Sequence, residues 1–327
     1  MIVDTYDRAH TYLRISLTDL CNLRCAYCMP EEHYHFMPVA HLMQPAEIET
    51  IAKTFVSLGV NKIRLTGGEP LARCDFNAIL NRLSPLPVEL SLTTNATLLH
   101  RELDNIQAAG INSLNISLDT LCREKFRELT HRDLFDQTFR NIHLAIERRF
   151  NVKINMVVMK GVNENEILDF IKWTKEQPVE IRLIEFMPFA GNRWKGAQVF
   201  SRKEMLDLIS ATYEIEQLPV AEHSTSSVFH IPEHAGNFGV ISTMSEPFCA
   251  GCNRMRLTAD GKMKNCLFSK DETDLLSALR NGLPLEPLIR NNILAKAAKL
   301  GGQFGNSPID ELKGDELINR SMISIGG

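Results

Sequence analysis

Residues 13–28 read LRISLTDLCNLRCAYC, a short run of aliphatic residues followed at once by three cysteines. The apolar run is typical of a buried strand, and the polar residues after it are typical of a strand end. Chemically reactive side chains therefore stand directly after the first predicted strand. Along the first two thirds of the chain, further strands are followed in the same way by polar or glycine-rich motifs.

Six such strands are predicted, and helical stretches separate them. The strands are residues 13–18, 62–66, 89–95, 113–119, 153–160 and 180–187. The helical stretches are residues 45–58, 75–83, 101–109, 134–149 and 164–176. Strands that alternate with helices predict parallel βαβ units with right-handed crossovers. This pattern fits either an open doubly wound sheet or a partial barrel.

The positions of the polar motifs favour the barrel. TGGEP, TTN, SLD, MKG and EFMP all lie at strand ends, and the carboxyl ends of the strands form the functional face of a barrel. We therefore predict an α/β fold, with a partial (β/α)6 TIM-like barrel over residues 1–214 and a C-terminal α+β extension over residues 215–327. The extension is predicted to hold strands within residues 226–243, a hairpin closed at Asp260–Gly261, and helices over 271–280 and 286–299.

Composition and charge limit the classes of function. The chain has 327 residues and a formal net charge of −4, so it shows no overall basic surface for nucleic acid. No apolar run reaches the roughly 18 residues of a membrane helix, and the first residues lack the apolar core of a signal peptide. We expect a cytoplasmic protein that binds neither nucleic acid nor a membrane.

Six of the eight cysteines fall into two groups of three, which in a long cytosolic chain indicates metal binding rather than disulfides. The first group, Cys21, Cys25 and Cys28, offers three thiolates from one loop. Iron–sulfur clusters are normally held by four thiolates, so a four-iron cluster here leaves one iron open to another ligand. A zinc site closed by a fourth Cys or His is the alternative.

The second group consists of Cys249, Cys252 and Cys266. Zinc is a stronger alternative here, because a CxxC pair with a distant cysteine also occurs in zinc ribbons. Both groups nevertheless stop at three ligands. This shared feature favours a second cluster, whose open iron would bind the substrate.

Cationic side chains lie in or beside the predicted strands. Arg254 and Arg256 share one side of a strand, because side chains at i and i+2 point the same way. In a barrel, the cations of four other strands converge on one cavity, and these are Arg14, Arg64, Lys153 and Arg182. Guanidinium groups match phosphate oxygens. The pattern predicts a polyphosphate site, and scattered surface charge is the alternative.

CNLRCAYC at residues 21–28 and GGEP at residues 67–70, in this order, resemble the signatures of the radical S-adenosylmethionine superfamily. The resemblance implies a cluster whose open iron binds S-adenosylmethionine, with release of a 5′-deoxyadenosyl radical on reduction. Contacts with this cofactor are implied for Tyr27, Gly68, Ser117 and Met187. Core packing is the alternative for Met187, and capping of the following helix is the alternative for Ser117.

Over nearly its whole length the chain resembles the GTP 3′,8-cyclase family of molybdenum cofactor biosynthesis. The motifs that carry the resemblance are residues 12–30, 62–70, 93–95, 115–119, 182–188, 249–267 and Gly326–Gly327. The resemblance implies a lyase with two [4Fe-4S] clusters that removes the ribose 3′ hydrogen of GTP and joins C3′ to C8 of guanine. GTP contacts are implied for Arg14, Arg64, Thr93, Lys153, Arg182, Arg254, Met255 and Arg256, and a catalytic role for Gly326 and Gly327.

The same resemblance implies a homodimer, a reductant such as flavodoxin, and transfer of the product to cyclic pyranopterin monophosphate synthase. Two residues depart from the family pattern. Leu20 stands where the family often has arginine, and Ala96 stands where it favours glycine. Both residues neighbour the predicted site without supplying a ligand, so they do not alter the resemblance to the family.

Three other functions fit the sequence less well. A radical maturase with an auxiliary cluster usually carries more C-terminal cysteines than the three found here. A zinc-dependent nucleic-acid module would show a basic face and stacking aromatics, whereas the net charge is −4 and aromatics make up 7% of the chain. A non-catalytic iron–sulfur carrier has no need of GGEP or of arginines in strands.

Overall fold

A twelve-stranded sheet runs through the whole chain in the order β12-β11-β10-β1-β2-β3-β4-β5-β6-β9-β8-β7. The computed structural model describes residues 1–327 except 30–33, 221, 305–308, 313 and 315–316. The first six strands are β1 (Tyr12–Ser16), β2 (Lys62–Thr66), β3 (Glu89–Thr94), β4 (Ser113–Ser117), β5 (Asn151–Val158) and β6 (Glu180–Glu185). Each is parallel to the next. Because the six strands also lie in chain order, without the reversal of a doubly wound sheet, the predicted partial barrel is confirmed.

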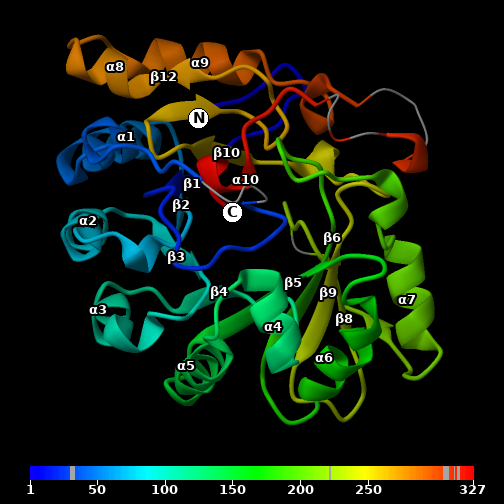
Figure 1. Cartoon of the computed structure of the whole chain (residues 1–327). Helices are drawn as coiled ribbons and strands as arrows, with labels where there is room; N and C mark the ends of the chain where they lie inside the picture. Colours follow the sequence, from blue (N-terminus) through cyan, green and yellow to red (C-terminus); the bar gives the residue numbers. More distant parts are fainter. Residues whose placement is uncertain (30–33, 221, 305–308, 313, 315–316) are drawn as a thin grey trace.

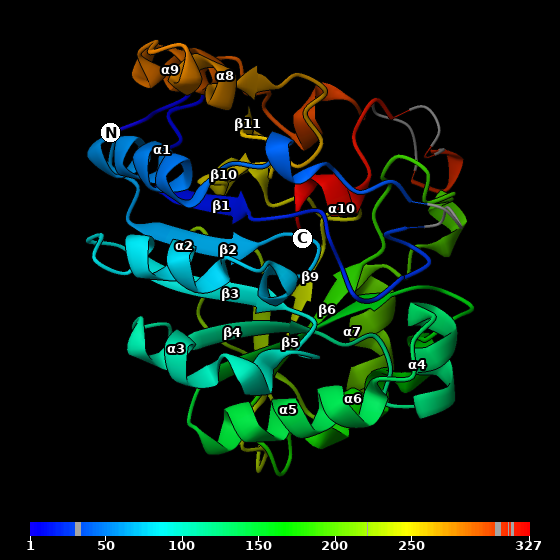
Figure 2. The same cartoon turned by 60° about the vertical axis from the view of Figure 1, so that its left-hand side comes forward.

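Helices cover the outer face of these strands, as alternating βα units require. They are α1 (Pro45–Ser57), α2 (Phe76–Leu83), α3 (Leu103–Ala108), α4 (Arg123–Thr130), α5 (Phe135–Glu147), α6 (Ile167–Trp173) and α7 (Arg202–Ser210). Figure 2 shows α1, α2 and α3 against the same face of the sheet. In α1 the residues that are buried recur at helical spacing and include Ile48, Ile51 and Phe55.

Two of these helices, α4 and α7, were not among the predicted stretches. α4 buries only Phe126 and Thr130, so its apolar periodicity is too weak to stand out. α7 does carry a local signal, because Ser201 and Glu204 form a capping box at its start. The capping box alone could have located this helix.

The C-terminal part extends the barrel sheet at both edges. β9 (Asn237–Ile241) pairs in parallel with β6, and β10 (Arg254–Leu257) pairs in parallel with β1. The remaining elements are β7 (Glu216–Gln217), β8 (Ser227–His230), β11 (Lys262–Lys264), β12 (Thr273–Asp274), α8 (Leu275–Arg280), α9 (Leu285–Leu294) and α10 (Met322–Ile325). The predicted hairpin is confirmed, since β10 and β11 are antiparallel and Gly261 adopts a φ of 71° in the turn.

Short 3-10 helices join many of these elements. They are η1 (Val39–His41), η2 (Pro70–Ala72), η3 (Leu99–Arg101), η4 (Glu164–Glu166), η5 (Gly196–Gln198), η6 (Cys249–Gly251), η7 (Leu300–Gly302) and η8 (Ile309–Glu311). Two of them adjoin the predicted site, since η2 begins two residues after Gly68 and η6 begins at Cys249.

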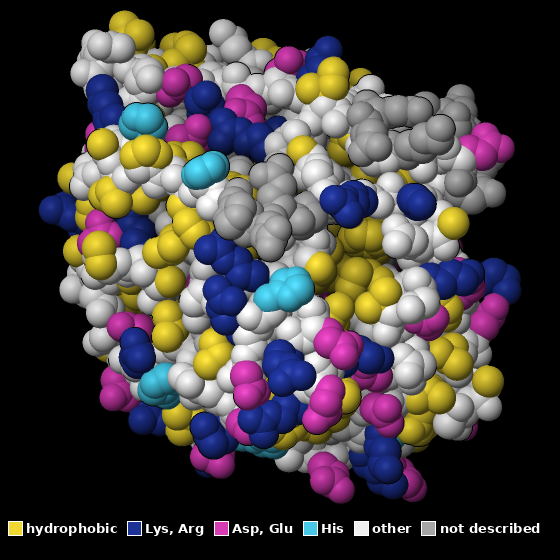
Figure 3. Space-filling view, viewed as in Figure 1, with side chains coloured by type: hydrophobic (Ala, Val, Ile, Leu, Met, Phe, Trp, Pro, Cys, Tyr) yellow, Lys and Arg dark blue, Asp and Glu magenta, His cyan; other side chains and the backbone are white. Residues whose placement is uncertain are grey.

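α10 lies within the ring formed by the strands, and the chain end lies beside it (Figure 1). On the face seen in Figure 3, Lys and Arg side chains are interspersed with Asp and Glu side chains. In the described part of the chain, no helix combines the length and the apolar character needed to cross a membrane. The cytoplasmic location stays a prediction.

Candidate active site

A cavity of about 710 Å³ is lined by both groups of cysteines. The six cysteines are free and half-buried, and they are Cys21, Cys25, Cys28, Cys249, Cys252 and Cys266. The first group follows β1, and the second group flanks the β10–β11 hairpin, which pairs with β1. The parallel pairing of β1 with β10 thus brings together two motifs that are more than 200 residues apart in the sequence.

The thiols of the first group influence one another. The pKa of Cys25 is raised by burial and further by Cys28, Asp119 and Cys21. Burial, with the neighbouring Glu69, raises the pKa of Cys21 to about 11. Buried thiols whose ionisation is opposed by each other and by carboxylates need a cation to become thiolates. This arrangement fits an iron–sulfur cluster held by the three cysteines.

In the second group, the surroundings of Cys252 favour the thiolate. Burial alone would raise its pKa, but the cations of Arg254 and Lys296 outweigh burial and lower the pKa to about 6. The thiolate is the form that binds metals. Among the described residues, no group of three or more His, Cys, Asp or Glu side chains is placed to hold a single metal ion. A cluster differs from a single ion in offering a separate iron to each thiolate.

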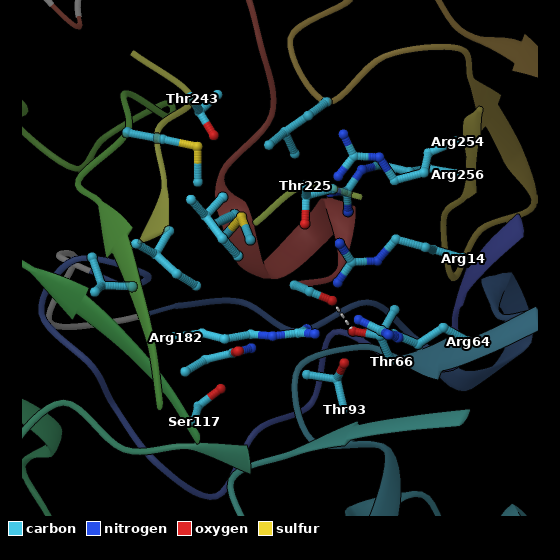
Figure 4. A pocket seen from close by; sticks show the side chains of 18 of the residues that line it. Arg14, Arg64, Thr66, Thr93, Ser117, Arg182, Thr225, Thr243, Arg254 and Arg256 are labelled. Atoms are coloured by element: carbon cyan, nitrogen blue, oxygen red, sulfur yellow. Dashed lines mark hydrogen bonds between the residues drawn. The ribbon is translucent and has the colours of Figure 1, made fainter. Parts of the chain in front are cut away.

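Three arginines form an arc across adjacent strands. Arg14 on β1 stands in register with Arg64 on β2 and with Arg256 on β10. All three line the cavity, and Figure 4 shows their guanidinium groups directed into it. Burial, followed by the charge of Arg256, lowers the pKa of Arg14 well below its usual value. Like charges opposite one another destabilise a sheet, so a bound anion would stabilise these three arginines.

Other cations complete the wall of the cavity. Arg254 enters beside Arg256, and Arg182 enters from the opposite side (Figure 4). Lys153 also lines the cavity, and it shares Glu180 with Arg182 at distances of 3.3 Å and 2.6 Å. One shared carboxylate leaves this side of the cavity positively charged as well.

Several buried polar atoms that face the cavity have no hydrogen-bond partner among the described residues. They are Tyr12 Oη, Arg14 Nε, Thr93 Oγ1, Asn155 Oδ1 and Asn253 Oδ1. An unpaired buried polar atom is costly. Together with the cations, these atoms indicate a site for a polar, anionic ligand.

Met255 is the exception among the residues expected to bind the nucleotide. Its side chain is fully buried in the hydrophobic core, on the opposite side of β10 from Arg254 and Arg256, and it does not line the cavity. Side-chain alternation along a strand explains this placement. Any substrate contact at this position has to come from the main chain.

The four residues expected to contact S-adenosylmethionine all line the cavity, and they are Tyr27, Gly68, Ser117 and Met187. At Gly68 the backbone approaches closely, because a Cβ there would lie 2.5 Å from Leu20 O and 2.6 Å from Asp19 O. Tyr27 Oη donates to Asp119 Oδ2 over 2.7 Å. These contacts fix the wall on which a cofactor would lie.

The sequence did not assign roles to two buried acids at strand ends. Glu69 of the GGEP motif accepts hydrogen bonds from Thr94 Oγ1 and from the N–H of Asn95, so it ties the end of β2 to the end of β3. Burial raises its pKa to about 7. Asp119 similarly accepts from Tyr27 and from the N–H of Val157. SLD and GGEP marked these positions, but their partners are distant in sequence.

Gly326 and Gly327 lie against the arginine arc. The carbonyl of Gly326 accepts from Arg256 over 2.6 Å, and Thr66 Oγ1 donates to the oxygen of Gly327, drawn as the dashed line in Figure 4. Gly326 has a φ of 88°, and a Cβ there would lie 2.7 Å from Ser16 Cβ. The position therefore requires glycine.

We expect Gly68→Ala to lower the free energy of unfolding by about 1–3 kcal/mol, because the added methyl group forces two main-chain carbonyls apart. Gly251→Ala is the matched control, since a Cβ at Gly251 meets no atom within 4 Å. We expect this control to change stability by less than about 0.5 kcal/mol. Urea unfolding of the two variants measures the difference, and equal stabilities would show that the backbone yields at Gly68.

His10 is fully buried, and its Nε2 lies 3.1 Å from Asp4 Oδ2. Burial, and then the charge of Lys296, lowers its pKa from 6.5 to about 4. Between pH 6.5 and 4, His10 is protonated in the unfolded chain and neutral in the folded chain. The free energy of unfolding therefore falls as the pH falls from 6.5 toward 4.

From this residue alone we expect the free energy of unfolding to be about 2 kcal/mol lower at pH 5 than at pH 7. Urea unfolding across this range, compared between wild type and His10→Gln, isolates the contribution. An identical pH dependence in both proteins would rule it out.

The comparisons with known proteins agree with this geometry. A family model described as Radical SAM superfamily matches residues 15–174, and one described as Molybdenum Cofactor Synthesis C matches residues 179–301. The GTP 3′,8-cyclase, mitochondrial, of Arabidopsis thaliana is 44% identical over 100% of this chain and 84% of its own length. The chain belongs to the GTP 3′,8-cyclase family.

Members of this family differ in length. Molybdenum cofactor biosynthesis protein 1 of Mus musculus is 46% identical over 99% of this chain, and the chain spans about half of that protein, 51% of its length. Among solved structures, Streptococcus suis SuiB bound to S-adenosylmethionine is similar with a TM-score of 0.60 and 18% identity, covering 86% of this chain and 68% of SuiB. This likeness supports the fold alone.

The two family matches meet between residues 174 and 179, and the domain boundary predicted at residue 214 stays a prediction.

Proposed function

We propose that the chain is a radical S-adenosylmethionine enzyme that converts GTP to 3′,8-cyclo-7,8-dihydro-GTP, the first step of molybdenum cofactor biosynthesis. One observation carries this proposal: both groups of three cysteines and the strand-borne cations line the same cavity. A zinc-binding module or an electron carrier needs no such cavity. A peptide maturase needs no arc of arginines around it.

Cys21, Cys25 and Cys28 would hold the first [4Fe-4S] cluster, and Tyr27, Gly68, Ser117 and Met187 would hold S-adenosylmethionine beside it. When bound and reduced, this pair supplies a 5′-deoxyadenosyl radical, while the protein supplies position and shielding. The closeness of Gly68 to the loop before Cys21 keeps the cofactor wall against the cysteines. Asn95, whose Nδ2 lies 3.8 Å from Cys21 Sγ, links β3 to the same loop.

The cations of the cavity would bind the triphosphate of GTP. Arg14, Arg64 and Arg256 offer three neighbouring guanidinium groups, and guanidinium groups match phosphate oxygens. The other proposed contacts are Lys153, Arg182, Arg254, Thr93 and the main chain of Met255. Bound in this way, the nucleotide is held between the two cysteine groups, with its ribose accessible to the radical.

Cys249, Cys252 and Cys266 would hold a second [4Fe-4S] cluster, whose open iron binds the guanine edge. Gly326 and Gly327, which contact Arg256 and Thr66, would border the nucleotide in a catalytic role. The reaction forms a C3′–C8 bond. The resulting nucleotide radical then takes up one electron and one proton to give the product, so an external reductant is required. From membership of the family we further propose a homodimer, flavodoxin or a similar reductant, and transfer of the product to cyclic pyranopterin monophosphate synthase.

The test is a reaction with anaerobically reconstituted and reduced protein, S-adenosylmethionine and GTP, analysed by mass spectrometry. Formation of 5′-deoxyadenosine together with cyclised GTP supports the proposal in full. Formation of 5′-deoxyadenosine with GTP unchanged would retain the radical chemistry and reject the substrate. If neither product forms and the bound metal is zinc, the proposal fails.

A further inference from the structure

Lys296 contacts the second cysteine group from behind the cavity. It is only 4% exposed, its Nζ lies 3.5 Å from Cys252 Sγ, and it donates to the carbonyl of Arg254 over 3.1 Å. An ammonium buried without a counter-charge is costly. Among the described residues no carboxylate pairs with Lys296, so the sulfur of Cys252 is the counter-charge at hand.

The segment that carries Lys296 is held firmly against the cysteine loop. The N–H of Leu300 points at Cys249 Sγ over 3.5 Å, so residues 296–300 contact two of the three cysteines. Arg8 Nη1 donates to the carbonyl of Cys249 over 2.9 Å and to that of Ala298 over 2.8 Å. One guanidinium group therefore joins the cysteine loop to this segment.

Arg8 is itself fixed. Its Nε donates to Asp4 Oδ2 over 2.7 Å, and both residues are buried, at 8% and 4% exposure. Arg8 Nη2 adds a third main-chain contact, 3.0 Å to the carbonyl of Ala297. A charged side chain whose donors are used by buried acceptors does not rearrange easily. The Asp4–Arg8 pair thus fixes the position of Lys296 relative to Cys252.

We propose that Lys296 is a positioning residue for the second cysteine group, one that orients the Cys252 thiolate and raises the reduction potential of the cluster bound there. The inference rests on the second cluster of the proposed function. A hydrogen bond from an ammonium group stabilises added negative charge on the sulfur, so the reduced cluster gains more than the oxidised one.

The experiment compares Lys296→Met with Lys296→Arg, and uses Lys299→Met as the matched control, because Lys299 is exposed and only three residues away. Each reconstituted protein is titrated electrochemically, and the two clusters are followed by electron paramagnetic resonance. In Lys296→Met we expect about a tenfold shift in the ratio of oxidised to reduced second cluster, equivalent to about 59 mV toward negative potential. Lys296→Arg should shift less, and Lys299→Met and the first cluster should not shift.

Two results would overturn the inference. One is an unchanged potential in Lys296→Met with its iron content intact, and the other is an equal shift in Lys299→Met. If Lys296→Met loses the second cluster altogether, retention of iron by Lys296→Arg supports a charge-dependent role, and loss in both variants counts against it. Wild-type protein that binds both clusters but does not cyclise GTP would reject the proposed substrate and leave this result standing. If the wild-type protein binds only one cluster, the proposed role of Lys296 is wrong.

Discussion

We expect Cys21→Ala to abolish both 5′-deoxyadenosine and cyclised GTP, a loss of more than about a thousandfold in rate. Cys21 is one of three cysteines that line the cavity in the first group, with no fourth cysteine close to them in the sequence to take its place. Two thiolates do not hold a four-iron cluster with one open iron. Iron analysis should show the loss of about one cluster per chain.

Cys74→Ala provides the control for this variant. The Cys74 thiol is exposed and does not line the cavity, so its removal should leave iron content and both products at wild-type levels. Retention of 5′-deoxyadenosine formation in Cys21→Ala would contradict the assignment of this cysteine as a cluster ligand. Equal losses in the two variants would point to general damage by thiol removal.

The strands of the barrel were predictable because each is a short apolar run with a sharp end. Residues 62–66 match β2 at both ends, since Gly67 and Gly68 follow directly. The stretches predicted over 113–119 and 180–187 each run two residues past β4 and β6, because the motifs at the strand ends continue the apolar pattern. The parallel pairing of β9 with β6 and of β10 with β1 was not predictable. Pairing between strands far apart in sequence leaves no local signal.

The same distinction separates the parts of the site. The cysteines and the strand-borne cations that line the cavity could be predicted, because their residue types and spacing indicate the chemistry themselves. Lys296 and Arg8 could not be predicted, since the roles that we propose for them depend on contacts with residues about 40 and 240 positions away. Met255 shows what a motif leaves open. It belongs to a motif that we predict to bind the substrate, yet strand alternation directs its side chain into the core.

The arginine arc should make the protein less stable than it would be without these charges. Arg14 faces Arg64 and Arg256 across neighbouring strands, and its Nε has no partner among the described residues. Charges that are removed from water without partners oppose folding, and even buried ion pairs can be replaced by apolar side chains of similar size with a gain of about 1–4 kcal/mol. An anion in the cavity would remove this penalty.

We therefore expect Arg14→Met to raise the free energy of unfolding without ligand and to weaken GTP binding by about a hundredfold, since a charged contact with phosphate is worth about 2–5 kcal/mol. GTP at one hundred times its Kd should stabilise the wild type by about 2.7 kcal/mol, and the same concentration should stabilise Arg14→Met far less. Thermal unfolding with and without GTP measures both effects, with Arg101→Met as the control on an exposed arginine. A variant that loses stability and keeps the gain from GTP would show that Arg14 is a structural residue, and the polyphosphate site would then have to lie elsewhere in the cavity.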